Sequence, residues 1–534
     1  MTVRDTSAES SATATIRSVA HAAPLTPSDR YWLFLAMLPG LVAAGVYLFV
    51  MPYPGYGAGL YAKIALELQA NGYLLPARIP GYTVDGVPFA YPPLQFYILA
   101  VLFDLGFDPI AVARVLPAIA VIATQIPVYL LTRDITESRP TAAIATALVV
   151  LNPQVLQWHI SAGGVVRAFA FLYAMVAIYA GYHVFTSGNR RAMVLGAAAF
   201  GLTVLTHPTY TLFVVATYLL FWVVLDRSLI GFGRGALVGI GGLSIAAPWL
   251  WWVLSTHGLD VFTAAAGTHG GIGGGLEAAV AFLSPYHVLL LAAIGYLVVR
   301  REYLLVSWLV VVAVLFQQSR FAYAVGGIAL ATALYDLTIR ARLFGRLQAF
   351  SLGRFDRRAI GTVFLVVGIA VGGVYVSSEF ASQSDPLAPA FIDDSSVEAM
   401  EWAAAETPPD ATFVVVGDAA EWFPMMTDRT ILIGPWGVEW EGDGPFERQI
   451  TAYETSSECQ TATCVEQVAA SVGGSPDYVY VPRGRYTIRG HGMVTFGSLE
   501  RSFDRSPKWQ RAYENRDVII YRSKPVFESD ESEQ

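Results

Sequence analysis

Charged residues are scarce in this sequence, and lysine is almost absent. Asp, Glu, Lys and Arg make up 14% of the 534 residues, whereas 54% are hydrophobic. The only lysines are Lys63, Lys508 and Lys524. So small a charged fraction excludes a string of soluble domains. Apolar runs that recur from Tyr31 to Val376 instead predict a polytopic α-helical membrane protein.

Motifs for nucleotide hydrolysis are also absent. The sequence contains no Walker motif, no CxxC pair, no HExxH and no GxSxG. The glycine run from Gly270 to Gly275 is not followed by Lys and Ser or Thr, which a phosphate-binding loop requires. A nucleotide-hydrolysing pump is therefore disfavoured.

Cysteine is limited to Cys459 and Cys464, which lie five residues apart. This spacing favours a small disulfide over two free thiols, and a disulfide would place the tail outside the cytoplasm. The tail, residues 380–534, holds 26 acidic and 12 basic residues, whereas the rest of the chain holds 16 acidic and 22 basic. An acidic domain with few lysines is typical of a salt-adapted organism such as a haloarchaeon, and equally of a GC-rich genome.

Apolar segments divide the rest of the chain. We predict twelve, at about 31–51, 94–107, 111–131, 141–157, 165–185, 192–206, 209–225, 232–253, 280–299, 302–318, 321–338 and 359–377. Arginine-rich loops, including the stretch Arg340–Arg358, alternate with loops rich in His and aromatic residues. The positive-inside rule assigns the arginine-rich loops to the cytoplasm. Residues 1–30 are polar and precede a span too long for a signal peptide, so we expect a cytoplasmic N-terminal tail.

The segment 94–107 is the exception among these spans. Its 14 or so residues would reach only ~21 Å, against ~30 Å of hydrocarbon, so we predict that it does not cross. Eleven full crossings, or thirteen if one segment is really two, put the N-terminus inside and the tail outside. We therefore expect about 11–13 transmembrane segments in residues 31–379 and an extracytoplasmic domain in residues 380–534.

The tail alternates helical and strand patterns. "SVEAMEWAAAE" and "CVEQVAAS" are typical of helices, and "TFVVVG", "DYVYVP" and "DVIIYR" are typical of buried strands. A small α/β domain follows. The turn at Gly417 and Asp418 is open to two interpretations, a ligand loop or an ordinary strand-to-helix cap.

Residues 52–93 form a Pro-, Gly- and Tyr-rich loop after the first span. From Gly59 to Ala70 apolar residues recur at three- and four-residue spacing, which predicts a short amphipathic helix along the membrane surface. Seven breakers, from Pro76 to Pro93, then impose an irregular path that ends in a tandem proline at the next helix.

This order resembles a known family. The loop helix "GLYAKIALELQANGY", followed by "PFAYPPLQFYILAVLFDLGFDPIAVARVLPAIA" and later "GLTVLTHPTY", looks like the GT-C glycosyltransferases, especially the protein-mannosyltransferase and aminoarabinose-transferase branch and its archaeal relatives. The resemblance covers residues 31–380 in architecture, with sharper motifs in 57–118 and 201–210. It implies transfer of a sugar from a polyprenyl-phosphate donor to a glycan, lipid or protein acceptor on the outer side. No cofactor and no nucleic acid is expected.

The family places an Asp or Glu as base in a "D-x-G-L-Y"-like position after the first span. Here that position reads Gly57, Ala58, Gly59, so the carboxylate is missing. Asp85 is our candidate for the catalytic base or an acceptor ligand, with a turn-forming Asp-Gly as the alternative. Glu67 is a weaker candidate, because the polar face of a surface helix explains it.

The resemblance and the charge pattern select five residues for substrate binding. Arg114 matches the family's Arg after the "PPL" segment, and pairing with a phosphate or a carboxylate competes with snorkelling to the interface. Arg167 suits a phosphate, with an interface anchor as the alternative. His207 could donate to a phosphate or cap the turn at 206–209. Tyr61 and Tyr91 complete the set.

Four histidines, His159, His207, His257 and His269, are assigned to the outer face. A divalent cation is conceivable there, but loops so far apart show no ligand spacing, so no metal ligand is assigned. Arg320 could close over a substrate or anchor its helix.

Three functions remain open. The first is an inverting glycosyltransferase, with Asp85 as base and Arg114, Arg167 and His207 around the donor phosphate. The second is a degenerate member that only binds lipid-linked glycans. The third is a transporter of the same lipids, which internal inverted repeats would favour; we find none in the sequence.

Overall fold

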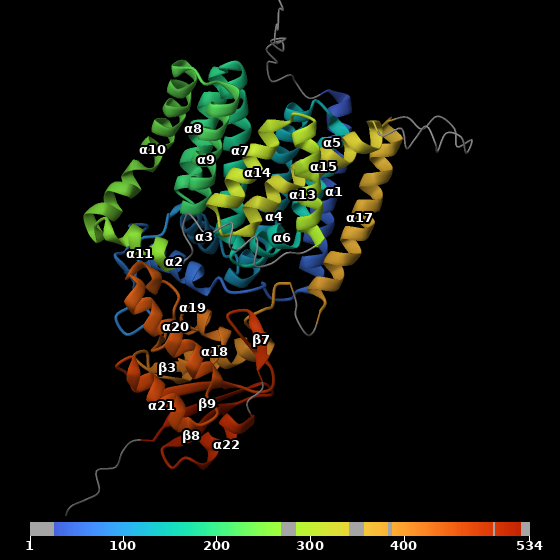
Figure 1. Ribbon diagram of the computed structural model, residues 1–534. Helices are drawn as coiled ribbons and strands as arrows, with labels where there is room; N and C mark the ends of the chain where they lie inside the picture. The colour runs from blue at the N-terminus through green and yellow to red at the C-terminus, as the bar shows by residue number, and fades with distance from the viewer. Residues whose placement is uncertain (1–25, 269–284, 341–356, 383–386, 495–496, 525–534) are drawn as a thin grey trace, which may run out of the picture.

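The computed structural model describes residues 26–268, 285–340, 357–382, 387–494 and 497–524. Figure 1 shows a bundle of helices standing on a smaller domain that contains a sheet. Most of the predicted N-terminal tail, His269, the Gly270–Gly275 run and most of the basic stretch Arg340–Arg358 lie outside the described residues.

The bundle makes this chain a multi-pass membrane protein. Six described helices are long and apolar enough to span a bilayer: α1 (Pro27–Val50), α4 (Pro109–Thr136), α7 (Gly164–Ser187), α9 (Pro208–Leu225), α10 (Leu229–His257) and α15 (Ser319–Arg340). The other main helices of the bundle are α3 (Leu94–Asp104), α5 (Arg139–Val150), α8 (Arg190–Val204), α13 (Pro285–Val299), α14 (Tyr303–Leu315) and α17 (Arg357–Phe380). With 11 residues, α3 is ~17 Å long and too short to cross.

Two predictions about the bundle need correction. The segment 141–157 was expected to be one helix, but it is broken into α5 and α6 (Pro153–Ile160). Asn152 begins α6 by accepting hydrogen bonds from the Gln154 and Val155 amides, and Pro153 fits the first helical turn. The loop expected near residue 260 contains helix α11 (Asp260–Thr268).

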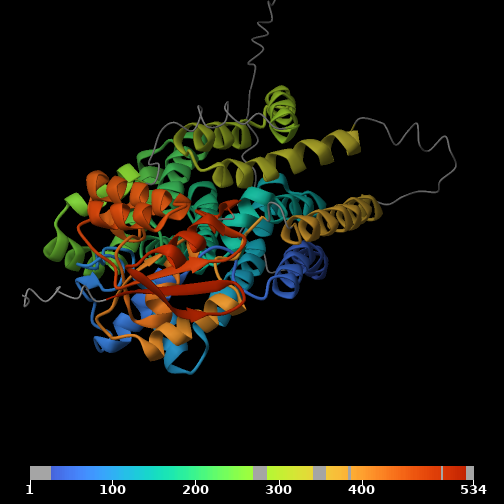
Figure 2. The same ribbon diagram turned by 90° about the horizontal axis from the view of Figure 1, so that it is seen from below.

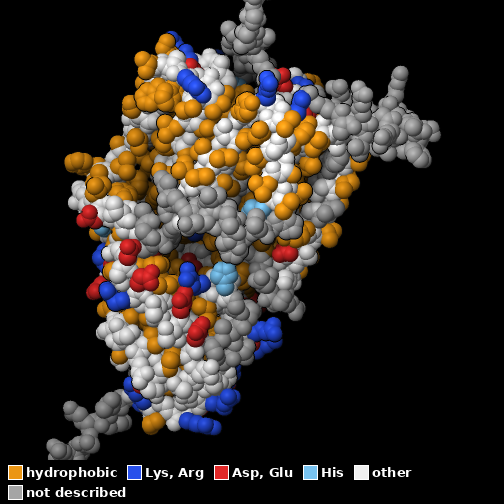
Figure 3. Space-filling view, viewed as in Figure 1, with side chains coloured by type: hydrophobic (Ala, Val, Ile, Leu, Met, Phe, Trp, Pro, Cys, Tyr) orange, Lys and Arg blue, Asp and Glu red, His pale blue; other side chains and the backbone are white. Residues whose placement is uncertain are grey.

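Basic residues mark the end of the bundle far from the sheet domain. In Figure 3 blue Lys and Arg side chains gather at the upper end, above a broad apolar band. Asp29 at the start of α1 pairs there with Arg139 (2.5 Å) and Arg133 (3.6 Å). The start of α1 and the C-terminal domain therefore lie at opposite ends of the bundle (Figure 1).

The C-terminal domain is built on a five-stranded sheet of order β4-β3-β5-β9-β8. β3 pairs in parallel with β4 and β5, and β9 runs antiparallel to β5 and β8. Its elements are α18 (Asp394–Glu406), β3 (Thr412–Val415), η1 (Asp418–Glu421), α19 (Phe423–Thr427), β4 (Thr430–Ile431), η2 (Val438–Trp440), α20 (Asp443–Glu458), α21 (Ala462–Ser471), β5 (Tyr478–Pro482), β6 (Tyr486–Ile488), β7 (His491–Val494), α22 (Gly497–Arg505), β8 (Trp509–Glu514) and β9 (Val518–Ser523). The three strand patterns and two helix patterns of the sequence all fall on such elements. Cys459 and Cys464 form the predicted disulfide.

The first loop is sandwiched between the bundle and this domain. Its helix α2 (Gly59–Ala70) has the predicted bounds, but it is mostly buried rather than lying along a membrane surface, because α3 and α19 pack against it. The short hairpin of β1 (Arg78–Ile79) and β2 (Val87–Pro88) follows. Tyr82 then pairs with Ile431, which extends the sheet beyond its edge strand β4.

One hydrophobic core runs through the loop and the domain. It includes Ile64 and Leu68 of α2, Phe96 of α3, and Phe413 and Trp422 of the C-terminal domain, all buried. Figure 2, seen from below, shows the sheet and its helices covering part of that end of the bundle. The C-terminal domain is therefore placed to form part of any site at this end.

Candidate functional site

A cavity of about 380 Å³ lies where the bundle, the first loop and the C-terminal domain meet. Its walls come from α2, the end of the first loop, α7, the α8–α9 turn, α10, α11 and η2. Such a space, enclosed by elements from both parts of the chain, is the usual setting of a ligand site.

One wall of the cavity is apolar. Leu212 of α9, Trp249 and Leu250 of α10, Phe262 of α11 and Phe316 after α14 line it. These helices are exposed to the membrane on their other faces, where large apolar side chains such as Leu219 and Trp251 project outward. The cavity therefore adjoins the lipid-facing part of the bundle.

Arg167, near the start of α7, supplies a positive charge to the cavity. The guanidinium lies 5.1 Å from the centre of the Trp158 ring, and that of Arg320 lies 5.6 Å from the same ring. A Cβ on Gly163 would come within 2.3 Å of Arg167 Nη1, so this glycine leaves room for the guanidinium. Within the described part of the chain, neither arginine forms an ion pair with a carboxylate.

Three further residues form the polar side of the cavity. His207 begins α9, and its Nδ1 accepts a hydrogen bond from the Thr209 amide (3.3 Å). In the neutral ring the proton is then on Nε2, which is the donor nitrogen. The Tyr91 ring lies 5.9 Å from both the His207 and the Tyr61 rings. Burial raises the pKa of both tyrosines, so their hydroxyls stay protonated.

The C-terminal domain completes the cavity with Glu439 and Trp440 of η2. The Trp440 ring lies 5.7 Å from that of Tyr91. Sequence reasoning assigned neither residue to the site, because η2 is a three-residue turn in the tail with no motif that points to the membrane domain. Only the docking of the tail onto the first loop brings them to the cavity.

Glu421, at the end of η1, lies against the first loop beside the cavity. Its side chain is buried, and a Cβ built on Gly57 would fall 1.5 Å from its Oε2 atom. Burial raises the pKa of this carboxyl to about 8; Asp418 adds to the rise and Arg167 opposes it. A raised pKa of this kind is typical of functional carboxyls as well as of crowded ones.

The structure brings together four of the five predicted substrate-binding residues. Tyr61, Tyr91, Arg167 and His207 all line the cavity, and His207 also caps the 206–209 turn, as its alternative interpretation proposed. Arg114 does not line it. Its guanidinium donates to the Leu48 carbonyl at the end of α1, so it ties α4 to α1.

Asp85 is exposed in a turn of the first loop and does not line the cavity. The Gly86 amide donates to the Thr83 carbonyl (3.1 Å), and Gly86 has a φ of +70°, which glycine adopts readily. Asp85 therefore occupies a turn-forming position. Glu67 pairs with Lys63 of the same helix (2.8 Å) and is likewise not among the cavity residues.

Asp418 holds its loop together. Its carboxylate accepts hydrogen bonds from the Arg489 and Gly490 amides (2.7 and 2.8 Å) and from the Tyr453 hydroxyl. These internal bonds match the structural interpretation of the Gly417–Asp418 turn.

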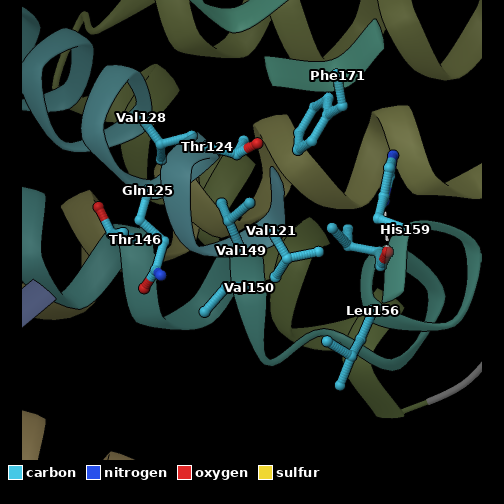
Figure 4. Close-up of a pocket in the computed structure, with 11 residues that line it drawn as sticks. Val121, Thr124, Gln125, Val128, Thr146, Val149, Val150, Leu156, His159 and Phe171 are labelled. Atoms are coloured by element: carbon cyan, nitrogen blue, oxygen red, sulfur yellow. Dashed lines mark hydrogen bonds between the residues drawn. The ribbon is translucent and has the colours of Figure 1, made fainter. Parts of the chain in front are cut away.

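A second, much smaller cavity lies inside the bundle. Figure 4 shows its lining of mostly apolar side chains, with His159 and Phe171 at one end. With about 20 Å³, it holds no more than a water molecule. The Nε2 atom of His159 lies 2.6 Å from the Tyr210 hydroxyl, so the ring is a buried structural group. Within the described ranges, no group of three or more His, Cys, Asp or Glu side chains could hold a metal ion.

Comparisons with known proteins bear on the fold. The family model of dolichyl-phosphate-mannose-protein mannosyltransferases matches residues 90–252, from the end of the first loop into α10. The crystal structure of ArnT from Cupriavidus metallidurans bound to undecaprenyl phosphate is similar over 93% of this chain and 98% of its own, at 13% identity and a TM-score of 0.53. The arabinofuranosyltransferase AftD from Mycobacteria is similar over 92% of this chain and 41% of its own, at 15% identity and a TM-score of 0.55. A search of curated proteins finds no match. At these identities the likeness is one of fold.

Proposed function

We propose that this chain, which has the GT-C fold of membrane glycosyltransferases, transfers a sugar from a polyprenyl-phosphate-linked donor to an acceptor on the outer face of the membrane. The observation that carries the proposal is that the cavity is apolar on one side and polar, with a positive charge, on the other. An apolar wall beside the lipid-facing helices ends at Arg167, which forms no ion pair with a described carboxylate.

This combination matches the chemistry of a polyprenyl phosphate. A prenyl chain requires apolar surface that continues into the bilayer, which α9, α10 and α11 offer. The phosphate requires a guanidinium free to form paired hydrogen bonds, and Arg167 is available for this. The side chains of His207, Tyr61 and Tyr91 line the same cavity and could contact the remaining phosphate or sugar oxygens.

Two features support an outer-face site. The disulfide in the C-terminal domain is stable in an oxidising compartment, and this domain closes the cavity. The arginines cluster at the opposite end of the bundle, as the positive-inside rule expects of the cytoplasmic side. We therefore assign the start of α1 to the cytoplasm and the C-terminal domain to the outside.

The reaction itself needs positioning and proton transfer more than a cofactor. The donor phosphate is the leaving group, and guanidinium contacts stabilise the charge that it gains. The acceptor hydroxyl must give up a proton to a nearby base as it attacks the sugar. The acceptor would approach from the C-terminal domain, opposite the prenyl chain.

The test is sugar transfer in membranes from cells that express the wild type or the Arg167→Gln variant at equal levels. Radiolabelled polyprenyl-phosphate hexoses and pentoses are supplied with native membrane acceptors. We expect label to enter an acceptor fraction with the wild type and to fall at least tenfold with the variant. If no sugar is transferred while polyprenyl phosphate still binds, the chain only binds lipid-linked glycans. If labelled lipid instead changes leaflet, the chain is a transporter.

A further inference from the structure

We propose that Glu421 of the C-terminal domain is the general base that takes the proton from the acceptor hydroxyl. The proposal rests on the proposed sugar transfer and names the residue that performs its proton-transfer step. It makes the C-terminal domain part of the active site.

The position of the carboxylate is the first observation. A Cβ on Gly57 would lie 1.5 Å from Glu421 Oε2, 2.1 Å from Cδ and 2.7 Å from Oε1. The carboxylate group therefore fills the volume into which a side chain of residue 57 would project. The family resemblance places a carboxylate in the position that reads Gly57, Ala58 and Gly59 here, and in the structure the Glu421 carboxylate of the tail lies beside Gly57.

The backbone around Glu421 is fixed to the first loop. The Tyr82 hydroxyl donates to the Glu421 carbonyl (2.5 Å), and Tyr82 is fully buried. Gly59 approaches so closely that a Cβ there would lie 2.1 Å from the Glu421 carbonyl oxygen and 2.6 Å from Trp422 Cα. This close packing holds the carboxylate in one place, as a catalytic group requires.

The carboxylate itself has no structural partner. Glu421 is only 7% exposed, and its carboxylate accepts no hydrogen bond from the residues that the structure describes. Its oxygens are not among the fully enclosed unpaired atoms, so they keep contact with open space. A buried carboxyl without partners is costly, so structural carboxyls are normally hydrogen-bonded or paired. Asp418, three residues earlier, has three such bonds. The contrast points to a ligand as the missing partner of Glu421.

Glu421 also lies within electrostatic range of the cavity. The charges of Arg167 and Glu439, which both line the cavity, act on its carboxyl, and its own charge acts on Tyr61. Glu439 lines the cavity directly but has another interaction within the protein. Glu421 is thus a carboxyl near the cavity that has no described hydrogen-bond partner and that can accept a proton once it is deprotonated.

The proposed step is a displacement at the anomeric carbon. The acceptor oxygen forms a bond to this carbon while the bond to the phosphate oxygen breaks. The electron pair of that bond leaves with the polyprenyl phosphate. The hydroxyl proton passes to the Glu421 carboxylate and later to solvent. Attack opposite the leaving group inverts the configuration of the anomeric carbon.

The proposal predicts a pH dependence. Burial, Asp418 and Glu439 raise the pKa of Glu421 and Arg167 lowers it, with a result of about 8. Tyr61 and Tyr82 also face this carboxyl, but burial raises the pKa of both hydroxyls, so they stay neutral. A base must be deprotonated, so kcat/KM should rise with pH up to a plateau above about pH 8.

The experiment compares Glu421→Gln with Glu406→Gln, an exposed glutamate of the same domain. With the transfer assay above, we expect kcat to fall by roughly 10²–10⁴ in Glu421→Gln. Binding of polyprenyl phosphate should stay within about twofold, because Glu421 is not assigned to the phosphate. Glu406→Gln should behave as the wild type.

A rescue variant separates catalysis from folding. Glu421→Ala leaves the space beside residue 57 empty, and Gly57→Asp then returns a carboxylate to it from the opposite side. We expect the double variant to transfer at least tenfold faster than Glu421→Ala alone, with a shifted pH profile. If the wild type transfers sugar and Glu421→Gln does so equally, Glu421 is not the base. Loss of transfer in Asp85→Asn or Glu439→Gln instead would assign the base to that residue. No transfer by the wild type would refute the proposed function itself.

Discussion

Arg167 and Arg320 face the same aromatic ring, with guanidinium carbons 5.1 and 5.6 Å from the centre of the Trp158 indole. Two like charges are thus held near one another without a described carboxylate between them. The stacking on Trp158, and for Arg320 also on Tyr210, offsets part of their cost. A bound anion beside Arg167 would relieve part of this repulsion, in agreement with the proposed position of the donor phosphate.

Replacing Arg167 should therefore weaken donor binding. We expect Arg167→Ala to raise the Kd for polyprenyl phosphate by roughly 10–100-fold, because a charge-assisted hydrogen bond contributes about 1.5–3 kcal/mol. Arg167→Lys should recover only part of the loss, since an ammonium cannot form the paired contact. The Kd is measured by titrating purified protein in detergent with polyprenyl phosphate. Arg516→Ala, which replaces an exposed arginine, is the control. Equal Kd values for Arg167→Ala and the wild type would exclude the phosphate role.

A buried lysine adds an ion pair between the first loop and the C-terminal domain. Lys63 Nζ lies 2.6 Å from Asp428 and 2.8 Å from Glu67, and the Lys63 side chain is 6% exposed. Asp428 is 83% exposed, so Asp428→Asn should cost less than about 1 kcal/mol, because Glu67 remains as partner. Lys63→Met should cost clearly more, since it removes the cation from both carboxylates. The melting temperatures of the two variants measure the two losses of stability. A larger loss in Asp428→Asn than in Lys63→Met would contradict this expectation.

The pKa of Glu421 also has a consequence for stability. The folded-state value of about 8 exceeds the ordinary value of 4.5, so between these values the folded protein holds a proton that the unfolded chain has lost. Stability should therefore fall by about 1.4 kcal/mol per pH unit over this range, from this group alone, and level off above about pH 8. Glu421→Gln removes the titration. We expect its melting temperature to exceed that of the wild type at pH 8 and the difference to shrink towards pH 5. A variant less stable than the wild type at pH 8 would show that the carboxylate stabilises the fold.

The disulfide gives a test of which side the domain faces. Cys459 and Cys464 should be oxidised in protein isolated from cells with thiols blocked, and no alkylating reagent should label them before reduction. Cys459→Ser with Cys464→Ser should destabilise the C-terminal domain by about 2 kcal/mol, the loop-closure value for so short a loop. Neither cysteine lines the cavity, so sugar transfer should persist at low temperature. If a membrane-permeant reagent labelled both thiols in intact cells without prior reduction, the cysteines would be reduced, and this would contradict an outside location.

Much of the fold was predictable because each part has a local signal. Apolar runs marked the bundle helices, and alternating or continuous apolar runs marked β3, β5 and β9. The break between α5 and α6 also had a signal, because Asn152 caps α6 and Pro153 begins it. A hydropathy average over the whole segment does not show these two residues. The burial of α2 had no such signal in the sequence, because an amphipathic helix can pack on another part of the protein as well as on a membrane surface.

The candidate site was predictable only on the bundle side. Tyr61, Tyr91, Arg167 and His207 belong to segments whose resemblance to a family could be recognised, and the cavity contains all four. Glu421, Glu439 and Trp440 lie more than two hundred residues further along, in turns without a motif. The one sequence signal for Glu421 was indirect: Gly57 lacks the expected carboxylate, and a missing group can be supplied from elsewhere in space.

Photo-crosslinking of a polyprenyl phosphate analogue tests the central claim most directly. A diazirine on the prenyl chain, close to the phosphate, is activated in purified protein and the labelled peptides are identified by mass spectrometry. We expect labels on α9, α10 and α11 around Leu212, Trp249 and Phe262, which excess polyprenyl phosphate displaces and Arg167→Ala strongly reduces. Labels confined to the outer surface of the bundle, unaffected by Arg167→Ala, would contradict the claim.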